Sequence, residues 1–364
     1  MKDLAVLEKV RSGERLGFEE GVGLYGWEDV WELGKWAEQA TLDRVGGEVY
    51  YSINRHINYT NVCRIGCGFC GFSRRLGEAG GYVMSVEEVV AEAQKAHESG
   101  ATEVHIVGGV HPELGFDYYV GMVEGIAEAC EGLHIKAFTA VEIIDLAEKA
   151  GMSVEGALGR LMEAGLGSMP GGGAEILSEG YFARACPNKP KPKEWLKVHA
   201  TAHGLGLRTN VTMLYGYIES EAERIEHLIK LRELQDESIK KGKGRFQCFV
   251  PLPYIRPGGT EGEAGGESEN VLVDLKTMAI SRLMLDNFDY VKAFWPMLGV
   301  KLAQVALSFG ANDLDGTVQQ YRVVDKKAVN SRDSMSVEEI EAMIGEAGRR
   351  AVQRDGFYNE YMGI

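Results

Sequence analysis

The sequence predicts an α/β fold in which strands and helices alternate and the parallel strands close into a TIM-type (β/α)8 barrel. Short runs rich in β-branched and aromatic residues alternate with helical patterns from about residue 48 onward, which is typical of a parallel sheet covered by helices. Seven or eight such strand–helix units are enough to close a barrel. The length of 364 residues fits one barrel with additions at its two ends.

The predicted strands and helices follow one another along most of the chain. Runs of β-type residues place strands at 48–53, 103–107, 134–139, 208–214, 246–251 and 290–294, with a short one near 168–169. Helical spacing of apolar residues places the main helices at 86–98, 118–130, 142–149, 154–163, 192–203, 221–237 and 272–286. Many of these helices end at a glycine, which favours a helix C-terminus there. A doubly wound open sheet is the alternative arrangement of the same elements.

Helical patterns also flank the region of alternating elements. We expect a short helical segment at 1–47, the barrel at 48–318 and a helical extension at 319–364, all within one structural unit. The clearest helix of the extension is predicted at 337–351. Residues 257–270 are rich in glycine and glutamate and predict a surface loop.

The charge balance is acidic and excludes two classes of partner. The chain has 39 Lys and Arg against 54 Asp and Glu, a net charge of −15. Nucleic acids and anionic membrane surfaces bind basic protein surfaces, so we expect neither as a partner. The sequence shows no export signal and no apolar run long enough to span a bilayer. We therefore expect a cytoplasmic protein, in which cysteines stay reduced.

Three cysteines lie close together in the run C-R-I-G-C-G-F-C. Cys63, Cys67 and Cys70 have a C-x3-C-x2-C spacing, which supplies one thiolate fewer than a closed four-thiolate iron–sulfur or zinc site needs. An iron without a protein ligand is open to another molecule. Phe69 offers a flat apolar surface beside the third cysteine. The pattern predicts a cluster with an open iron, and its alternatives are a zinc loop or three unrelated thiols.

The other three cysteines are scattered along the chain. Cys130, Cys186 and Cys248 lie in apolar or helical contexts and are expected to be buried thiols. A fourth ligand from among them stays open, although none has a paired spacing.

Active sites of such barrels lie at the carboxyl ends of the strands, so residues there are candidates. Gly108 and Gly109 follow the strand at 103–107 and let a ligand approach the backbone, although a tight turn is the alternative. His111 comes next and is a candidate for proton transfer or substrate contact, or else it caps a helix. Glu142 could accept hydrogen bonds from ribose hydroxyls or from a charged substrate amine, or it could be the first-turn acid of its helix.

The later strand ends add further candidates. Glu175 follows three glycines, which are costly in chain entropy unless the backbone is needed close to a ligand. Asn210 and Thr212 share one face of the strand at 208–214 and could reach a ligand, with Tyr215 near the rim. Ordinary barrel packing is the alternative for this strand.

Two arginines are candidates for binding a carboxylate substrate. Arg256 and Arg282 could each form two parallel hydrogen bonds to a carboxylate. Solvent exposure on the surface is the alternative for each of them.

Several stretches together resemble the radical S-adenosylmethionine (radical SAM) enzymes. The matching stretches are N-Y-T-N-V-C-R-I-G-C-G-F-C-G-F-S-R at 58–74, P-G-G-G-A-E at 170–175, T-M-L-Y-G at 212–216, L-R-E-L-Q-D-E at 231–237 and G-A-N-D-L-D-G-T at 310–317. They resemble the branch that makes deazaflavin and the menaquinone precursors of the futalosine pathway. Within it, G-G-V-H-P-E-L at 108–114 and K-A-F-T-A-V-E-I at 136–143 look most like the aminofutalosine synthases.

The resemblance implies a radical SAM barrel, two cofactors and a reaction. A [4Fe-4S] cluster would bind SAM, as a co-substrate, at its open iron. An electron donor such as a flavodoxin or ferredoxin would then drive SAM cleavage. In the synthases the resulting 5′-deoxyadenosyl radical adds to a small carboxylate, 3-[(1-carboxyvinyl)oxy]benzoate, and rearrangement with decarboxylation gives aminodeoxyfutalosine. The resemblance makes Cys63, Cys67 and Cys70 the cluster ligands. Of the candidates named above, the cofactor contacts would be Phe69, Gly108, Gly109, Glu142, Glu175, Asn210 and Thr212, the catalytic residues His111 and Tyr215, and the substrate-binding residues Arg256 and Arg282.

Other functions stay open at this point. Residues 253–260 and 321–334 depart from the synthase pattern, so a dehypoxanthine futalosine cyclase or a deazaflavin-forming enzyme is the alternative within the family. An iron–sulfur electron-transfer or sensor protein is the alternative outside the enzymes. An electron carrier would normally supply four thiolates and needs no large barrel, so the sequence favours catalysis.

Overall fold

Seven parallel strands form the main sheet of the computed structural model, which describes residues 2–256, 270–318, 320, 323 and 332–361. In sheet order they are β2 (Asn54–Ile57), β3 (Glu103–Ile106), β4 (His134–Ala137), β5 (Ser168–Met169), β6 (Arg208–Tyr215), β7 (Phe246–Pro253) and β8 (Tyr290–Val291). The sheet order equals the chain order, as expected when each connection is a right-handed helical crossover. Six of these strands overlap predicted ones, whereas β2 lies just beyond the predicted strand at 48–53.

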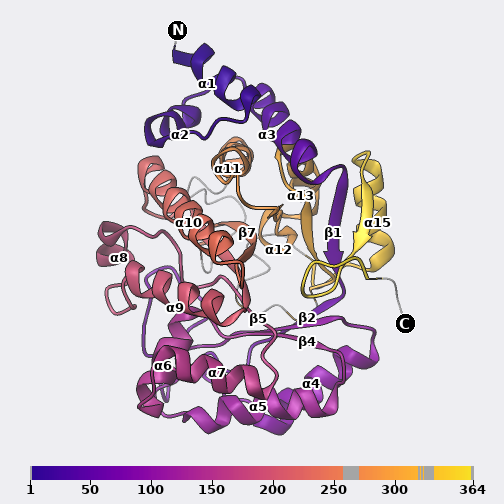
Figure 1. Ribbon diagram of the computed structural model, residues 1–364. Helices are drawn as coiled ribbons and strands as arrows, with labels where there is room; N and C mark the ends of the chain where they lie inside the picture. The colour runs from indigo at the N-terminus through magenta and orange to yellow at the C-terminus, as the bar shows by residue number, and fades with distance from the viewer. Residues whose placement is uncertain (1, 257–269, 319, 321–322, 324–331, 362–364) are drawn as a thin grey trace.

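Helices connect successive strands and cover the outer face of the sheet (Figure 1). They are α4 (Val86–Glu98), α5 (Phe116–Ala129), α6 (Ala140–Ala150), α7 (Val154–Ala164), α8 (Glu179–Ala185), α9 (Pro192–Leu205), α10 (Glu221–Lys241), α11 (Val271–Met284), α12 (Trp295–Leu298), α13 (Val300–Ala306) and the 3-10 turn η2 (Leu307–Phe309). Ser85, Thr139 and Ser220 begin three of these helices, because their hydroxyls accept hydrogen bonds from backbone N–H groups of the first turn.

The N-terminal part is helical, as predicted. It consists of α1 (Lys2–Ser12), α2 (Phe18–Tyr25) and α3 (Val30–Val45). In Figure 1 these indigo helices lie at one end of the barrel, where α2 packs on α10 and α3 packs on α11.

The barrel is partial, and a second sheet occupies the gap in its wall. This sheet is parallel and has the order β10 (Arg350–Gln353), β1 (Glu48–Ser52) and β9 (Asp313–Gly316). Ile53 alone separates β1 from β2, and Lys292 after β8 forms an isolated bridge with Asp313 in β9. The predicted α/β barrel is therefore confirmed as a sheet of seven strands. The predicted strand at 48–53 corresponds to β1 of the second sheet, and β2 was not predicted.

The C-terminal region contains a strand that the sequence did not indicate. Helix α15 (Val337–Glu346) lies within the predicted helix 337–351. Gly348 then has a φ of 73°, a left-handed conformation that ends helices. The chain continues as β10, which pairs with β1. The proposed division at residues 47 and 318 remains a prediction, and the described elements on either side pack together.

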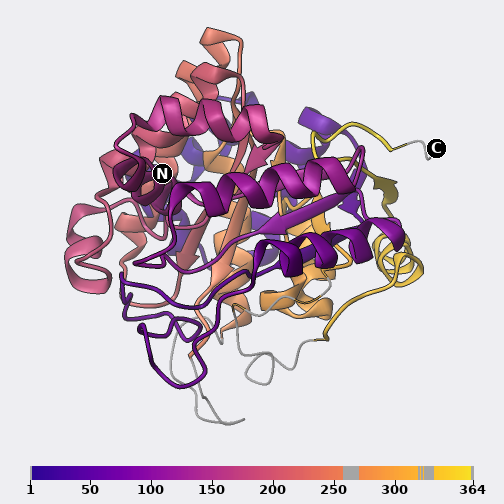
Figure 2. The ribbon, with the colours of Figure 1, turned by 90° about the horizontal axis from the view of Figure 1, so that it is seen from below.

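Two further predictions concern loops and membranes. The predicted loop 257–270 lies outside the described residues apart from Asn270, which begins α11. Within the described ranges, every helix is too short or too polar to cross a membrane. Figure 2, turned by 90°, shows the long loop after β2 in purple at one end of the sheet.

Candidate functional site

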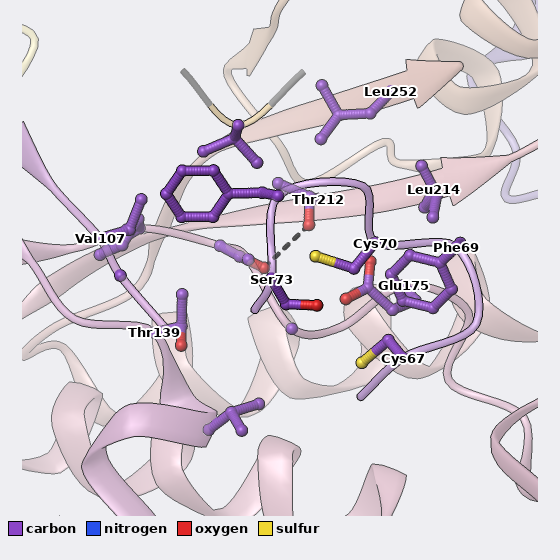
Figure 3. A pocket seen from close by; sticks show the side chains of 18 of the residues that line it. Cys67, Phe69, Cys70, Ser73, Val107, Thr139, Glu175, Thr212, Leu214 and Leu252 are labelled. Carbon is purple, nitrogen blue, oxygen red and sulfur yellow. Dashed lines mark hydrogen bonds between the residues drawn. The ribbon is translucent and has the colours of Figure 1, made fainter. Parts of the chain in front are cut away.

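A cavity of about 730 Å³ lies at the carboxyl ends of the strands. The loops after β2, β3, β4 and β5 line it together with residues of β6 and β7. Many of its side chains are apolar, including Val107, Leu214, Val250, Leu252 and Phe294. Figure 3 shows Val107 and Leu214 on opposite sides of it. Pockets for small molecules and cofactors are typically about 300–1,000 Å³, so the cavity has the size of such a site.

The loop after β2 carries the three neighbouring cysteines, and its own hydrogen bonds fix its course. The backbone N–H of Cys63 donates to the carbonyl of Arg74, and that of Cys70 donates to the carbonyl of Cys67. Gly66 has a φ of 70°, which a glycine adopts without strain. None of the three cysteines forms a disulfide, and all line the cavity. Figure 3 shows the sulfur atoms of Cys67 and Cys70 at one side of it.

The thiols lie against an apolar wall. Cys63 and Cys67 pack beside Ile65, Val110 and Val141. Burial raises the pKa of Cys63, because a thiolate is poorly solvated there. A positive centre such as iron is what holds buried thiols of this kind in the thiolate form.

The outlying cysteines are buried, as predicted. Cys130, Cys186 and Cys248 are each almost fully enclosed, and none of them lines the cavity. Cys186 is hydrogen-bonded to Cys67, and this bond, followed by burial, raises the pKa of Cys67.

Three thiols on one loop fit a cluster better than a single ion. In the part of the chain that the structure describes, no three His, Cys, Asp or Glu side chains converge as the ligands of one metal ion do. The irons of a [4Fe-4S] cluster lie at separate corners and each takes its own ligand, so its thiolates need not converge. Cys63, Cys67 and Cys70 therefore fit such a cluster and leave one iron for another molecule.

Four predicted cofactor contacts, Phe69, Glu175, Asn210 and Thr212, line the same cavity. The Thr212 hydroxyl donates to the carbonyl of Gly171 at 2.9 Å (Figure 3). Asn210 is buried, and its Oδ1 has no hydrogen-bond partner among the described residues. A buried acceptor without a partner is costly, so a donor on a bound molecule, such as an amino group of SAM, would satisfy it.

Two glycines of the β3 loop are required by the packing of the chain itself. A Cβ on Gly108 would lie 2.6 Å from the ring of Tyr59, and a Cβ on Gly109 would overlap the carbonyl oxygen of Val62. The tight turn considered above therefore accounts for both glycines. Both also line the cavity, so their backbone remains a candidate contact for a cofactor.

Glu142 lies behind the wall of the cavity and accepts hydrogen bonds from residues of that wall. Its carboxylate accepts hydrogen bonds from the hydroxyl of Tyr59, the backbone N–H of Gly108 and the N-cap residue Thr139. Glu142 is 3% exposed and does not line the cavity. The predicted direct contact with a cofactor is therefore not found, and the first-turn alternative is the one that the structure contains.

The two predicted catalytic residues do not line the cavity either. His111 accepts hydrogen bonds at Nδ1 from the backbone N–H groups of Glu113 and Leu114, which fits the capping alternative. Tyr215 is 1% exposed and its hydroxyl donates to Asp274 at 2.7 Å. Since both side chains are held away from the cavity, the structure does not support a catalytic role for either.

The two predicted substrate-binding arginines are also placed elsewhere. Arg282 is buried and donates to the carbonyls of Gly310 and Phe288 and to the side chain of Asn312. Its guanidinium is thus committed to the protein, and the prediction of a substrate clamp is wrong. Arg256 is exposed after β7 and does not line the cavity.

Lys189 is a cavity residue that the sequence did not indicate. It forms an ion pair with Glu175, and its ammonium group lies 5.3 Å from the centre of the Phe69 ring. Glu175 has a φ of 44°, which is uncommon for a residue other than glycine. No motif marks Lys189, because its place depends on the path of the chain after α8.

Four polar residues that the sequence did not indicate form the inner end of the cavity. They are His56, His105, Lys292 and Asp315, from β2, β3, the end of β8 and β9. The rings of His56 and His105 stack with centroids 4.5 Å apart. Asp315 accepts hydrogen bonds from Lys292 and from the amide of Asn54, and it has a left-handed φ of 71°. We refer to these four residues as the polar end.

Buried ion pairs connect the polar end with the rest of the barrel interior. Lys292 is 3.4 Å from Asp313, which pairs with Arg354 of the C-terminal region at 2.8 Å. Glu103 pairs with Lys136 at 2.6 Å. Burial opposes the charge of Glu103, but Lys136 and Arg354 lower its pKa to about 2. The C-terminal region thus completes the interior of the barrel.

Family comparisons cover most of the chain. Residues 57–231 match the radical SAM superfamily, and residues 243–362 match the CofH/MqnC C-terminal region. The aminodeoxyfutalosine synthase of Thermus thermophilus is 39% identical over 359 residues, 98% of this chain and 95% of the relative. The 5-amino-6-(D-ribitylamino)uracil–L-tyrosine 4-hydroxyphenyl transferase 1 of Methanosarcina barkeri is 39% identical over 332 residues, 90% of this chain and 86% of the relative.

Solved structures share the fold at low sequence identity. A methylornithine synthase matches with a TM-score of 0.73 and 16% identity over 95% of this chain and 97% of its own. The FeFe-hydrogenase maturase HydG of Carboxydothermus hydrogenoformans matches with a TM-score of 0.72 and 17% identity over 98% of this chain and 80% of its own. Both likenesses confirm the predicted fold.

Proposed function

We propose, because the chain belongs to the radical SAM enzymes of the CofH/MqnC family, that it is an aminodeoxyfutalosine synthase. Enzymes of this family are transferases that use a [4Fe-4S] cluster and SAM. The proposed reaction joins the adenosyl group of SAM to 3-[(1-carboxyvinyl)oxy]benzoate, with rearrangement and decarboxylation, in menaquinone biosynthesis. The observation that carries the proposal is the 39% identity to a synthase over almost the full length of both chains.

The residues of the cavity fit the two tasks of such a reaction, which are to bind the cofactors and to exclude water. Cys63, Cys67 and Cys70 would hold the cluster, which together with SAM supplies a 5′-deoxyadenosyl radical when both are bound. Asn210 and Glu175 would orient SAM by hydrogen bonds, since both line the cavity. The apolar side chains of β6 and β7 would exclude water from the reacting carbons.

A small electron carrier such as a flavodoxin or ferredoxin would supply the electron. We also propose a cytoplasmic location, because a reducing compartment keeps the three cysteines available for iron. An electron-transfer or sensor role without turnover is set aside, because two relatives of 39% identity, a synthase and a transferase, are both enzymes.

The second candidate is the transfer of a 4-hydroxyphenyl group from tyrosine to 5-amino-6-(D-ribitylamino)uracil. It is favoured by the 39% identity to the transferase of Methanosarcina barkeri. At full coverage the identities favour the synthase, with 39% against 36% for the transferase of Methanopyrus kandleri.

One experiment separates the candidates. The protein is reconstituted anaerobically with iron and sulfide and given SAM, a strong reductant and one substrate set at a time, and products are identified by mass spectrometry. An adenosyl group joined to the benzoate unit establishes the synthase. A 4-hydroxyphenyl adduct of the ribitylaminouracil establishes the second candidate, and 5′-deoxyadenosine alone with both sets rejects both; the cyclase substrate, dehypoxanthine futalosine, is then the next to offer.

A further inference from the structure

His105 lies at the inner end of the cavity with its hydrogen-bonding capacity unused. It is half-buried and lines the cavity from β3. No other described residue forms a hydrogen bond with either of its ring nitrogens, in contrast to His111, His134, His199 and His203. A ring nitrogen that lines a cavity and has no partner among the described residues is available to a bound ligand or to water.

The ring of His105 is held in place by its neighbours. His56 is its direct partner across the parallel β2–β3 ladder, and the two rings stack 4.5 Å apart with an interplanar angle of 26°. Nε2 of His56 lies 3.7 Å from a carboxylate oxygen of Asp315. Asp315 is itself fixed by Lys292 and Asn54. His105 is therefore a rigid group rather than a mobile one.

The charge state of His105 decides what it can bind. Burial, and then the neighbouring His56 and Lys136, hold its pKa well below the ordinary value. The imidazole is therefore neutral near pH 7, with one N–H donor and one nitrogen acceptor. Such a group recognises an oxygen that can accept or donate a hydrogen bond, such as a carboxylate or a phenol.

The position of His105 assigns it to the second reactant rather than to SAM. The cysteines lie on a loop beyond β2, whereas His56 and His105 lie within β2 and β3 and so sit deeper in the barrel. A molecule bound to a cluster on this loop would fill the outer part of the cavity. Phe294, 6.4 Å from His56 between ring centres, also lines the inner end, so an aromatic ring would find both apolar and polar contacts there.

We propose that His105 is a substrate-binding residue that hydrogen-bonds an oxygen substituent on the aromatic ring of the substrate, with His56 as its positioning residue. The inference rests on the proposed function, in which that oxygen belongs to the benzoate carboxylate. In the second candidate function the same chemistry is supplied by the phenol of tyrosine.

Direct binding tests the proposal without requiring turnover. The reconstituted protein with SAM is titrated with 3-[(1-carboxyvinyl)oxy]benzoate and, separately, with L-tyrosine, by calorimetry under anaerobic conditions. His105→Phe keeps an aromatic ring but removes both hydrogen-bonding atoms. His105→Gln restores a donor and an acceptor. His97→Phe is the matched control, because His97 is exposed on α4 and does not line the cavity.

For the probe that binds, His105→Phe should weaken binding by about tenfold or more, His105→Gln should recover most of the affinity, and His97→Phe should match the wild type. Iron content should be unchanged in all three variants, and His97→Phe should also keep the substrate-free SAM cleavage of the wild type. If His105→Phe lacks iron or unfolds, His105→Leu, which has no hydrogen-bonding atom, takes its place. Wild-type affinity in a folded His105→Phe or His105→Leu protein overturns the inference but leaves the proposed function standing. If the wild type binds neither probe, both the inference and the proposed function are rejected.

Discussion

Lys189 forms an ion pair with Glu175 in the wall of the cavity, next to the loop that carries the three cysteines. Both side chains are largely buried, with 6% of Lys189 and 13% of Glu175 exposed. The ammonium group also lies 5.3 Å from the centre of the ring of Phe69, a residue that stands between Cys67 and Cys70 in the sequence. One lysine therefore connects the glycine-rich loop after β5 with the cysteine loop after β2.

Removal of this lysine should destabilise the protein. In Lys189→Met the carboxylate of Glu175 stays enclosed without its counter-ion, and breaking a buried pair in this way typically costs about 3 kcal/mol or more. The free energy of unfolding, measured by urea denaturation of the apoprotein, should fall by that order. Lys193→Met is the control, because Lys193 is exposed on α9. Equal stability of the two variants would show that the ion pair contributes little.

The three-cysteine site makes a prediction about metal content. Cys67→Ala should lose the brown colour and the iron after anaerobic reconstitution, because two thiolates do not hold the cluster. SAM cleavage should be lost with it. Cys130→Ala removes a buried thiol away from the cavity and should keep both properties. Retention of iron and of SAM cleavage by Cys67→Ala would refute the assignment of this ligand.

The junction of the two sheets makes a steric prediction. A Cβ on Gly316 of β9 would overlap the carbonyl oxygen of Ser52 and lie 2.8 Å from Oδ1 of Asn54. Gly316→Ala should therefore lower the free energy of unfolding by about 1–3 kcal/mol, the usual cost of overpacking. Gly121→Ala is its matched control.

Gly121 lies within α5, and a Cβ there would meet no atom within 4 Å. Alanine favours a helix over glycine by about 1 kcal/mol, so Gly121→Ala should raise the melting temperature whereas Gly316→Ala should lower it. A Gly316→Ala protein as stable as the wild type would mean that β9 and β1 do not approach as closely as described.

His134 makes a prediction about pH. Its Nε2 lies 2.7 Å from the hydroxyl of Ser168, and burial lowers its pKa from 6.5 to about 4. Between these values the unfolded chain takes up a proton that the native protein does not. Stability is therefore complete above pH 6.5 and falls as the pH decreases toward 4, by an amount on the order of 3 kcal/mol for this residue.

The slope of stability against pH measures this effect. His134→Gln keeps a donor for Ser168 but cannot be protonated. The slope of the unfolding free energy against pH between pH 6.5 and 4 should therefore fall by up to the equivalent of one bound proton. Denaturation curves at several pH values provide the slope. A variant that declines as steeply as the wild type would show that His134 is not the titrating group.

Local patterns in the sequence predicted most of the elements. Glycine and hydroxyl residues mark helix ends by effects that act over a few residues, as Thr139 and Gly151 do at the two ends of α6. The end of the C-terminal helix was predicted too late, and β10 was missed. Its pairing with β1 joins residues about 300 positions apart, which local periodicity does not encode.

The candidate site was predicted only in part, because sequence patterns act locally whereas the site combines distant segments. Phe69, Asn210 and Thr212 were predicted to face the cavity and do line it. Arg282 was predicted as a substrate clamp, but its guanidinium donates hydrogen bonds to the backbone carbonyls of Gly310 and Phe288. A sequence shows which chemical group a side chain carries, whereas the neighbours of that side chain depend on how distant segments pack.

The sequence by itself determined the thiol donor set, the alternation of strands and helices, and the family, because spacing along the chain is enough for each. Only the tertiary structure decided that Lys189 faces the cysteine loop and that His56, His105, Lys292 and Asp315 meet at the inner end of the cavity. These residues come from segments that are far apart in the chain. His56 and His105 meet because they are register partners on neighbouring parallel strands and so lie at the same depth of the barrel, whereas Lys189 reaches the site from the connection after α8.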